Sequence, residues 1–520
     1  MNDMKKRIFL CVVLLLISVL TVFVIHHLSM NLLDSDTSGE MLLSKCIHDE
    51  KSPVCHDWDY TIEYRINNQL IFAFLFAFIS DWFTVRFIGT LIILLIYVLT
   101  FVFFLRSCGF KTDTILFGCI LVLLPYCVSY GRIVLYYSFY APYLSFVFLI
   151  IGCFFRLLEG QSKWWITGLA LFSVLGCING FRQFYITMIP MCALGLWHLI
   201  LTKRKKAFLL SLFSSLWGVI GLMIHSFIIM RNIHFEMKLA EMIVFKGVSE
   251  AIVIFFTIMR HFGYRSGIDK FSFLGMMSLA GVGVMVYALF VSIKGFICER
   301  TEKKLYLKGM LFVQLVMTAG TMVFYALPFN TRFDYSRYFV PASFWVIPLF
   351  LTVLEERKQQ LHKLIFSVVL AVFIGNSVIN LCFFLDPNTF RQDFDGLGYT
   401  STDYITQYDE VIRFIKDEGY QMGYSFHDAN VLSEKLNGLP VVSIEKNGDK
   451  IFYSEWLTRK SYRDTKADKV FLWAYYDEAM TFLSTEAAKD ADLAYNFRDR
   501  LLLFDLKDPE GFKAFLRQNH

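Results

Sequence analysis

Charged residues are scarce in this chain. They make up 18% of its residues, whereas soluble domains ordinarily carry about 25%. Three kinds of motif are also missing: a cysteine and histidine spacing suited to zinc, a glycine-rich phosphate loop in the polar C-terminal stretch, and a basic stripe interleaved with aromatic residues. We therefore expect neither a soluble protein nor one that binds zinc or nucleic acid.

Hydrophobic residues are abundant instead. They form 56% of the chain, and phenylalanine alone occurs 55 times; the mean hydropathy is +0.51. This balance predicts an integral membrane protein. Most cysteines lie in apolar segments, where a thiol acts as a small hydrophobe. Only Cys46 and Cys55 share a polar loop, and a disulfide between them requires that this loop faces an oxidising compartment.

The chain begins with a basic segment and a hydrophobic run. Lys5, Lys6 and Arg7 precede an apolar run over 8–25. A secretory signal peptide is the competing interpretation, but this run is long for the hydrophobic part of such a peptide, and no small-residue cleavage site follows it. We expect a retained first transmembrane helix with a cytoplasmic N-terminus.

Apolar runs separated by short polar breaks continue to residue 384. About 20 apolar residues span the hydrocarbon layer, and we place further spans near 86–105, 113–129, 134–155, 164–180, 185–202, 207–230, 272–296, 309–327, 338–354 and 364–384. Every second loop is then basic, as the positive-inside bias requires. The expected fold is an α-helical polytopic membrane protein of about 11 transmembrane helices. Interfacial segments are expected in its external loops at 57–65 and 251–259, and a re-entrant or interfacial helix is expected at 71–79.

The composition changes after Phe384. Residues 385–520 contain no stretch able to span a membrane, and short apolar strands alternate there with helices, which predicts a small α/β domain. Because the number of spans is odd, this domain is expected to be extracytoplasmic. Residues 1–384 then form the membrane domain, with a first external loop at about 29–70. We expect helices at 404–417, 428–436, 477–483 and 509–518, and strands at 422–426, 441–444, 469–474 and 501–504.

Two aspartates, Asp34 and Asp36, lie in the first external loop. Carboxylates at the mouth of a membrane bundle are costly to desolvate and are often functional. An aspartate can take the proton of an attacking hydroxyl group. Asp-x-Asp can also bind Mg²⁺ or Mn²⁺, and either aspartate can simply cap the helix that follows. The motif alone does not separate these roles.

Arginines lie in the same predicted external loops. A departing lipid phosphate gains negative charge, and the arginine fork can donate two hydrogen bonds to phosphate. A single external arginine more often contacts lipid headgroups, however, and Arg337-Tyr338 also suits an ordinary interfacial anchor. The candidates are Arg65, Arg132, Arg182, Arg260, Arg265, Arg332 and Arg337.

Three segments carry a resemblance to a known family. They are residues 33–40 (LDSDTSGE), the pair Trp58-x-Tyr60 with Glu63-Tyr64-Arg65, and Arg337-Tyr338-x-x-Pro341. Together with the layout of the chain, they resemble the C-type (GT-C) superfamily of polytopic membrane glycosyltransferases, and more narrowly its bacterial members with a soluble C-terminal domain. That superfamily includes protein O-mannosyltransferases, oligosaccharyltransferases and the aminoarabinose transferase of lipid A.

The resemblance implies transfer of a sugar, with inversion, from a polyprenyl-phosphate-linked donor. The acceptor would be an extracytoplasmic cell-wall polysaccharide, teichoic-acid-like polymer, lipid or protein. The general base would be Asp34 or Asp36, with Asp34 favoured because it lies nearer the membrane. The segments that carry the resemblance add Glu40, Trp58, Tyr60 and Glu63 as supporting residues of the first loop, and Arg65, Arg337 and Tyr338 around the donor phosphate. Arg182, Arg265 and Arg332 join this phosphate group because they lie in the same predicted external loops.

One position of that family has no clear match. Its second acidic residue, in a later external loop, has only Glu236, Glu241 and Asp334 as stand-ins. We therefore assign no metal site, and Mg²⁺ or Mn²⁺ stays an open alternative. The segment Asp428–Leu432 resembles a helix start in related bacterial proteins, without an assigned role.

Two other functions stay open. A transporter or flippase for lipid-linked sugars would place charge near the membrane midplane, often in broken helices of a repeat, whereas most predicted spans here are nearly free of charge. A polysaccharide polymerase would join lipid-linked repeat units. The expected partners are the polyprenyl-phosphate-linked sugar, a cell-envelope acceptor and the lipid bilayer, and the expected location is the bacterial cell membrane.

Overall fold

Contacts between residues divide the chain into two compact units. The computed structural model describes residues 3–31, 33–60, 67–230, 251–264, 269–324, 335–356, 360–385, 403–426, 428–448, 450–455, 457–497 and 501–518. The membrane unit comprises Met1–His27, Thr90–Ile228 and Leu239–Tyr399. The loop–sheet unit comprises Leu28–Gly89, Ile229–Lys238 and Thr400–His520. The residues predicted as the first external loop thus group with the C-terminal residues.

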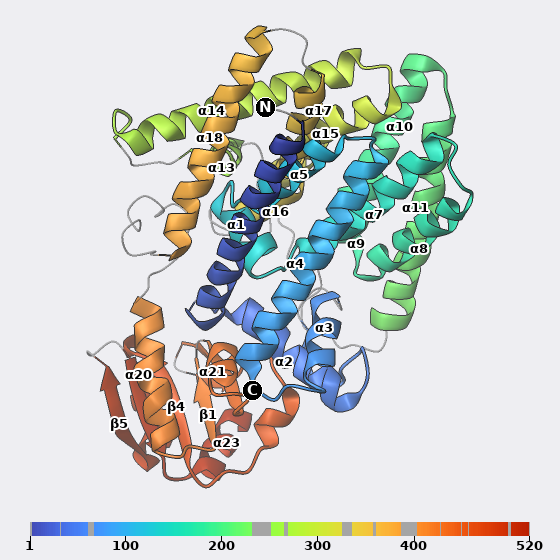
Figure 1. Ribbon diagram of the computed structural model, residues 1–520. Helices are drawn as coiled ribbons and strands as arrows, with labels where there is room; N and C mark the ends of the chain where they lie inside the picture. The colour runs from blue at the N-terminus through green and yellow to red at the C-terminus, as the bar shows by residue number, and fades with distance from the viewer. Residues whose placement is uncertain are drawn as a thin grey trace. The chain divides into compact units, whose positions relative to one another are not determined.

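Long apolar helices account for most of the first 385 residues (Figure 1). Within the described residues, nine helical segments are long and apolar enough to cross a membrane, which confirms the predicted multi-pass membrane character. They are Met4–Ser29, Trp82–Ser107, Ala141–Leu158, Phe181–Thr202, Lys206–Phe227, Phe273–Cys298, Glu302–Val323, Arg337–Glu355 and Ser367–Leu385.

The helical elements of this part include short π-helical turns, written η1 to η3. The elements are α1 (Asp3–Asn31), α4 (Trp82–Ser107), α5 (Thr112–Val122), α6 (Val128–Tyr130), η1 (Gly131–Tyr136), α7 (Ala141–Leu158), α8 (Trp164–Ile178), α9 (Phe181–Gln183), η2 (Phe184–Met188), α10 (Ile189–Thr202), α11 (Lys206–Ile224), η3 (His225–Ile229), α13 (Ala251–His261), α14 (Phe273–Cys298), α15 (Glu302–Phe324), α16 (Tyr335–Ser343), α17 (Val346–Glu355) and α18 (Gln360–Leu385).

Two predicted spans correspond to shorter helices. The run at 113–129 contains only α5, which has 11 residues, and the run at 164–180 contains α8, which has 15. Helix α5 ends just before Pro125, because the residue before a proline is disfavoured in helical geometry. Helix α8 ends at Ile178, and its C-cap residue Asn179 is followed by Gly180 with a positive φ of 99°. The predicted interfacial segment at 251–259 is helix α13.

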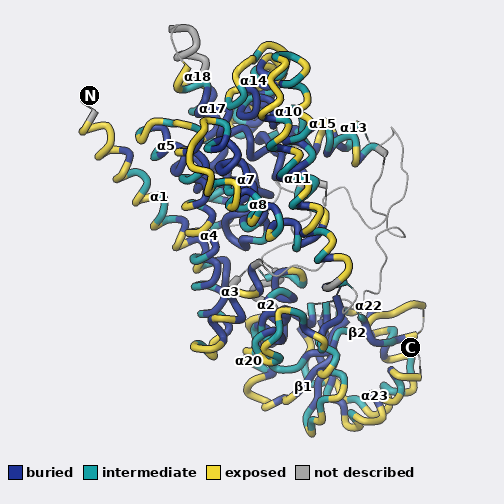
Figure 2. The backbone as a smooth tube through the Cα atoms, turned by 90° about the vertical axis from the view of Figure 1, so that its right-hand side faces the viewer, coloured by how far each residue is buried: buried dark blue, intermediate teal, exposed yellow. Residues whose placement is uncertain are grey.

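Helix α1 exposes apolar side chains along most of its length (Figure 2). Leu15, Leu16 and Val19 are each more than 60% exposed. Such side chains on a helix that packs little against other protein suit contact with lipid, because lipid tails are as apolar as leucine.

A six-stranded mixed sheet forms the C-terminal part of the loop–sheet unit (Figure 1). The strand order is β3-β2-β1-β4-β6-β5; β1 is parallel to β2 and β4, and the other pairs are antiparallel. The strands are β1 (Met422–Ser425), β2 (Val441–Asn447), β3 (Lys450–Tyr453), β4 (Val470–Tyr475), β5 (Ala491–Phe497) and β6 (Leu501–Leu506). The helices are α20 (Asp403–Asp417), α21 (Ala429–Lys435), α22 (Tyr476–Leu483) and α23 (Pro509–Gln518), with short 3₁₀ turns η7 (Lys460–Asp464) and η8 (Glu486–Asp490). The predicted small α/β domain is confirmed.

Helices cover both faces of this sheet because side chains alternate along each strand. On one face, Phe471 and Trp473 of β4 join a buried cluster with Val411 of α20 and Leu432 of α21. On the other face, Phe482 of α22 stacks edge-on against Phe504 of β6 and Phe512 of α23. The helices that follow β1 and β4 therefore lie on opposite faces of the sheet.

The loop–sheet unit also contains two helices from the predicted first external loop. They are α2 (Ser35–Glu50) and α3 (Asn67–Leu75), the latter covering part of the predicted segment at 71–79. Residues 57–60 of the predicted segment at 57–65 are not helical, because Trp58 pairs by its backbone with Arg459. Gly39 permits close packing of α2, since a Cβ atom there would lie 3.3 Å from Nδ2 of Asn430.

Candidate functional site

The acid motif, residues 33–40, forms the start of helix α2. Asp34 is the N-cap residue, in an extended conformation with φ −130° and ψ 167°. Its Oδ1 accepts hydrogen bonds from the backbone N–H of Thr37 at 2.8 Å and from the Thr37 hydroxyl at 2.8 Å. The Thr37 Oγ1 in turn accepts from the Asp34 N–H at 3.2 Å. This reciprocal pair is a capping box, so the capping hypothesis is confirmed for Asp34.

Asp36 and Glu40 share one face of α2, because residues four apart on a helix are neighbours. Asp36 is exposed in the first turn. Glu40 is half-buried and accepts from Nδ2 of Asn68 at 3.4 Å and from Nε2 of Gln69 at 3.3 Å. Both amides are buried on α3. Glu40 thus joins α2 to α3 one helical turn after the exposed Asp36.

The two predicted first-loop aromatic residues are buried. Trp58 is 1% and Tyr60 3% exposed. The Tyr60 hydroxyl accepts from the backbone N–H of Cys55 at 3.0 Å, and burial raises the pKa of Tyr60 well above its ordinary value. Both rings support the fold of the loop. Glu63 and Arg65 lie outside the described residues.

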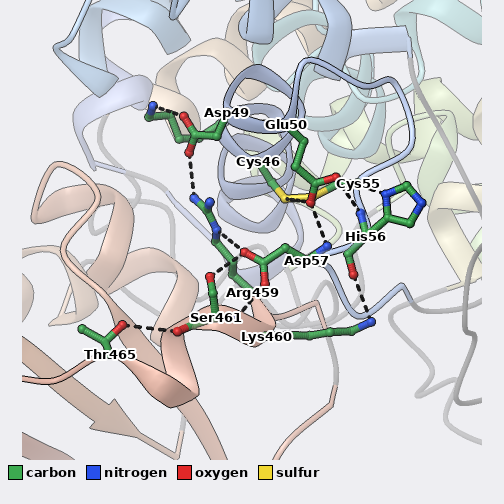
Figure 3. Close-up of polar contacts among 11 residues, drawn as sticks. Cys46, Asp49, Glu50, Cys55, His56, Asp57, Arg459, Lys460, Ser461 and Thr465 are labelled. Carbon is green, nitrogen blue, oxygen red and sulfur yellow. Dashed lines mark hydrogen bonds and ion pairs between the residues drawn. A yellow bond between two sulfur atoms is a disulfide. The ribbon is translucent and has the colours of Figure 1, made fainter.

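A disulfide and a set of ion pairs hold this loop (Figure 3). Cys46 and Cys55 are bonded, with their Cα atoms 6.1 Å apart, which is an ordinary disulfide separation. Around it, Arg459 donates to Asp49 at 2.9 Å and to Asp57 at 2.8 Å. Arg463 donates to Asp59 at 2.6 Å. We call these five charged residues the loop clamp; they attach the loop to the turn η7.

The pKa values of two carboxyls in this loop, Asp49 of the clamp and the neighbouring Glu50, follow from burial and hydrogen bonding. Burial opposes ionisation of Asp49, but hydrogen bonds from Lys45 and Arg459 outweigh it and lower its pKa. Burial likewise opposes ionisation of Glu50, but the backbone N–H groups of His56 and Asp57 outweigh it and lower the pKa of that carboxyl. Both carboxylates are therefore ionised at neutral pH and keep their partners ordered.

A buried ion pair that the sequence did not predict contacts the backbone of the acid motif. The Arg86 guanidinium donates to both carboxylate oxygens of Glu434, at 2.6 Å for Nη2 to Oε2. The same Nη2 donates to the backbone oxygen of Thr37 at 2.9 Å. Both side chains are 4% exposed. The only sequence signal for this pair was an arginine at the edge of an apolar run, a position that is costly without a partner.

The segment Asp428–Leu432, for which the sequence suggested no role, also contacts the acid motif. The Ser35 hydroxyl donates to Oδ1 of Asp428 at 3.1 Å. Nδ2 of Asn430 donates to the backbone oxygen of Leu457 at 2.9 Å and lies 3.4 Å from that of Ser35. The first turn of α2 is thus fixed by its own cap, by Arg86 and by the start of α21.

Three of the residues predicted around the donor phosphate lie together in the membrane unit. The Arg182 guanidinium lies over the rings of Tyr140, Tyr143 and Tyr338, at 5.3, 5.8 and 6.0 Å from their centroids. Arg337 lies over the same Tyr338 ring at 5.3 Å. We call these five residues the arginine–tyrosine cluster. Both guanidinium groups thus contact the Tyr338 ring, and a guanidinium group can also donate hydrogen bonds to an anionic group.

The other predicted arginines are distributed differently. Arg132 lies over the ring of Tyr137 at 5.6 Å, and Arg260 lies in the last turn of helix α13. Arg265 and Arg332, together with the stand-in acids Glu236, Glu241 and Asp334, lie outside the described residues.

One group of side chains in the described part of the chain has the spacing to hold a metal ion: Cys46, Glu50 and Cys55. The two cysteines are bonded to each other, so their sulfurs are not thiolate ligands. Asp34 and Asp36 belong to no such group among the described residues.

Comparison with known proteins adds no further residues to this site. No protein-family model matches the chain, and no curated protein matches it.

Proposed function

We propose that this chain is a polytopic membrane glycosyltransferase that transfers a sugar from a polyprenyl-phosphate-linked donor to an extracytoplasmic acceptor in the bacterial cell envelope. The observation that supports it most is the start of α2, which carries both aspartates: Asp34 forms a capping box, and the first turn is held by the buried Arg86 and by the start of α21. Preorganised groups of this kind are what a transfer reaction needs, because orientation lowers the barrier.

In the proposed reaction, a carboxylate of Asp34 or Asp36 takes the proton of the acceptor hydroxyl. The hydroxyl oxygen attacks the anomeric carbon from the side opposite the phosphate, and the bond from that carbon to the phosphate oxygen breaks. The configuration inverts, and the electron pair leaves with the lipid phosphate. Positive charge stabilises such a leaving group, and Arg182 and Arg337 remain candidates for that role among the described residues.

The proposed topology has about 11 spans, with the shorter α5 and α8 included. The N-terminus is then cytoplasmic and the loop–sheet unit extracytoplasmic. Basic residues in alternate loops support this orientation. The Cys46–Cys55 disulfide supports it too, because disulfides persist outside the reducing cytosol.

The test compares Asp34→Asn and Asp36→Asn with Asp81→Asn. Asp81 makes the same kind of cap, accepting from the Thr84 N–H at 2.8 Å, and asparagine caps helices about as well as aspartate. Transfer is measured from radiolabelled polyprenyl-phosphate sugars by the protein in vesicles. We expect at least one motif variant to lose about 10²-fold or more in activity with an unchanged unfolding temperature, and Asp81→Asn to stay active. Full activity in both motif variants would overturn the proposal.

A further inference from the structure

A pocket of about 720 Å³ opens in the loop–sheet unit. Its walls are formed by the residues after β1, the second half of β2, the end of β4 and the start of α22, with Ser35 of the acid motif on one side. Small-molecule sites have volumes of roughly 300–1,000 Å³. The size of this pocket therefore suits a small ligand.

The pocket lies at the topological switch point of the sheet, where the helices after neighbouring parallel strands go to opposite faces. Strands β1, β2 and β4 are parallel, so their carboxyl ends lie at the same edge. The helices that follow β1 and β4 cover opposite faces, as shown by the packing of Leu432 and of Phe482. The chain segments leaving these neighbouring strands diverge, and open α/β sheets bind their ligands in the crevice so formed.

The lining combines hydrogen-bond acceptors, donors and an aromatic ring. Asp428, Glu445 and Asp477 offer carboxylate oxygens, Ser443 offers a hydroxyl group, and Tyr475 offers a half-buried ring. Lys446 crosses the wall between β2 and α22, with Nζ 3.3 Å from the backbone oxygen of Asp477. A sugar hydroxyl both donates and accepts, so a mixed lining of this kind matches a carbohydrate.

Two other ligand classes fit the lining less well. An anion such as phosphate would meet the pocket's carboxylates, and like charges repel at close range. For a metal ion, ligand atoms must converge. Among the described residues, no three acidic side chains of the pocket bring their oxygens within 4.8 Å of one another. The acidic residues come from three separate elements: Asp428 follows β1, Glu445 lies on β2 and Asp477 lies on α22. A sugar ring likewise carries its hydroxyl groups at separate positions around the ring.

We propose that this pocket binds a saccharide, with Asp428, Glu445 and Asp477 accepting from its hydroxyl groups and the Tyr475 ring against its apolar face. Asp428 also accepts from Ser35, so the bound sugar would be connected to the acid motif through Asp428. The identification of this sugar as part of the acceptor rests on the proposed function; its binding does not.

The experiment measures sugar binding by the full-length protein in phospholipid nanodiscs, prepared without glycoside detergents that would compete. Saturation-transfer NMR is recorded with disaccharides and methyl glycosides of glucose, galactose, mannose, rhamnose and N-acetylglucosamine. The variants are Asp477→Asn, which removes an exposed carboxylate, and Ser443→Trp, which fills the pocket. Glu486→Gln, at an exposed position of the same unit, is the control.

We expect binding of at least one of these sugars, weakened about tenfold by Asp477→Asn, abolished by Ser443→Trp and unchanged by Glu486→Gln, with unfolding temperatures preserved. If Ser443→Trp does not fold, Asp477→Asn decides. Failure of every sugar to bind, or binding that both variants leave intact, would overturn the proposal.

The same variants separate this site from the transfer reaction. Whichever of Asp34→Asn and Asp36→Asn loses transfer is expected to leave sugar binding intact, whereas Asp477→Asn is expected to raise KM for the acceptor with little change in kcat. Sugar binding without any transferase activity would support the saccharide site and contradict the proposed function.

Discussion

At the scale of single residues, Asp34 illustrates how a structural and a chemical role can share one side chain. Its Oδ1 caps α2, which was predictable because a cap depends on residues only three positions away. Capping does not exclude proton transfer, since the carboxylate has a second oxygen. The cap fixes the orientation of the carboxylate, and fixed orientation is what a general base requires.

Arg182 leads to a residue-scale prediction. Its planar guanidinium lies over three tyrosine rings, and a lysine ammonium would lose the stacking and the bidentate contact with phosphate. We expect Arg182→Lys to raise KM for the lipid-linked donor about three- to tenfold. Arg156→Lys is the control, because Arg156 also stacks on rings, at 4.7 Å from the Trp165 centroid, in a loop predicted to be cytoplasmic. Equal KM values in the two variants would contradict the assignment.

Glu50 leads to a prediction about pH. Its pKa is lowered below the ordinary value of 4.5, so ionised Glu50 stabilises the folded loop fully above pH 4.5, and this stabilisation is lost as the pH falls through the folded pKa. The neutral Glu50→Gln variant lacks this pH-dependent stabilisation. We expect the unfolding temperature of the wild type to exceed that of the variant at pH 7 and the difference to shrink toward pH 3. Tryptophan fluorescence measures both; a difference independent of pH would argue against this role.

At the scale of elements, short-range patterns were predictable and long-range pairings were not. The predicted helices at 404–417 and 509–518 are α20 and α23 within a residue. Strands β3 and β5 were missed. Strand β5 carries the polar Asp492 and Asn496, and Phe497 is its one buried residue. Two contacts at or next to the acid motif, Arg86–Glu434 and Ser35–Asp428, join residues that are 348 and 393 positions apart in the sequence. Residue patterns carry no signal for such partners.

The Arg86–Glu434 pair carries a prediction at this scale, because it joins α4 to α21. Removing one partner leaves the other charge buried, which costs about 3–5 kcal/mol. We expect Glu434→Gln to destabilise the loop–sheet unit strongly. The double variant Arg86→Met with Glu434→Leu should recover most of that loss, because well-packed apolar residues often replace a buried pair without cost.

Denaturant unfolding of the single and double variants measures this coupling. Transfer activity provides a separate readout. Since Arg86 also donates to the Thr37 backbone, the double variant should be stable and still lose activity through a less fixed acid motif. A double variant that is both stable and fully active would show that the pair only stabilises the fold.

At the scale of the whole molecule, composition was enough to predict the membrane character. Only the structure shows that α2 and α3 belong to the same compact unit as the sheet. Composition changes sharply after residue 384 and therefore indicated a boundary there. Composition does not reveal which residues contact each other, so it could not predict that the first loop associates with the C-terminal residues.

The orientation of the chain carries the last prediction, because a lipid-linked donor outside the cell requires an extracytoplasmic acid motif. The exposed Cys11 and Cys298 are first replaced by serine. Glu486→Cys then reports on the loop–sheet unit, and Lys163→Cys reports on a loop predicted to be cytoplasmic. In intact bacteria, a membrane-impermeant maleimide should label the variant at 486 and should label the variant at 163 only after permeabilisation. Labelling in the opposite order would place the carboxylates of α2 on the cytoplasmic side, where the Cys46–Cys55 disulfide would not persist, and the proposed transfer reaction would fail with it.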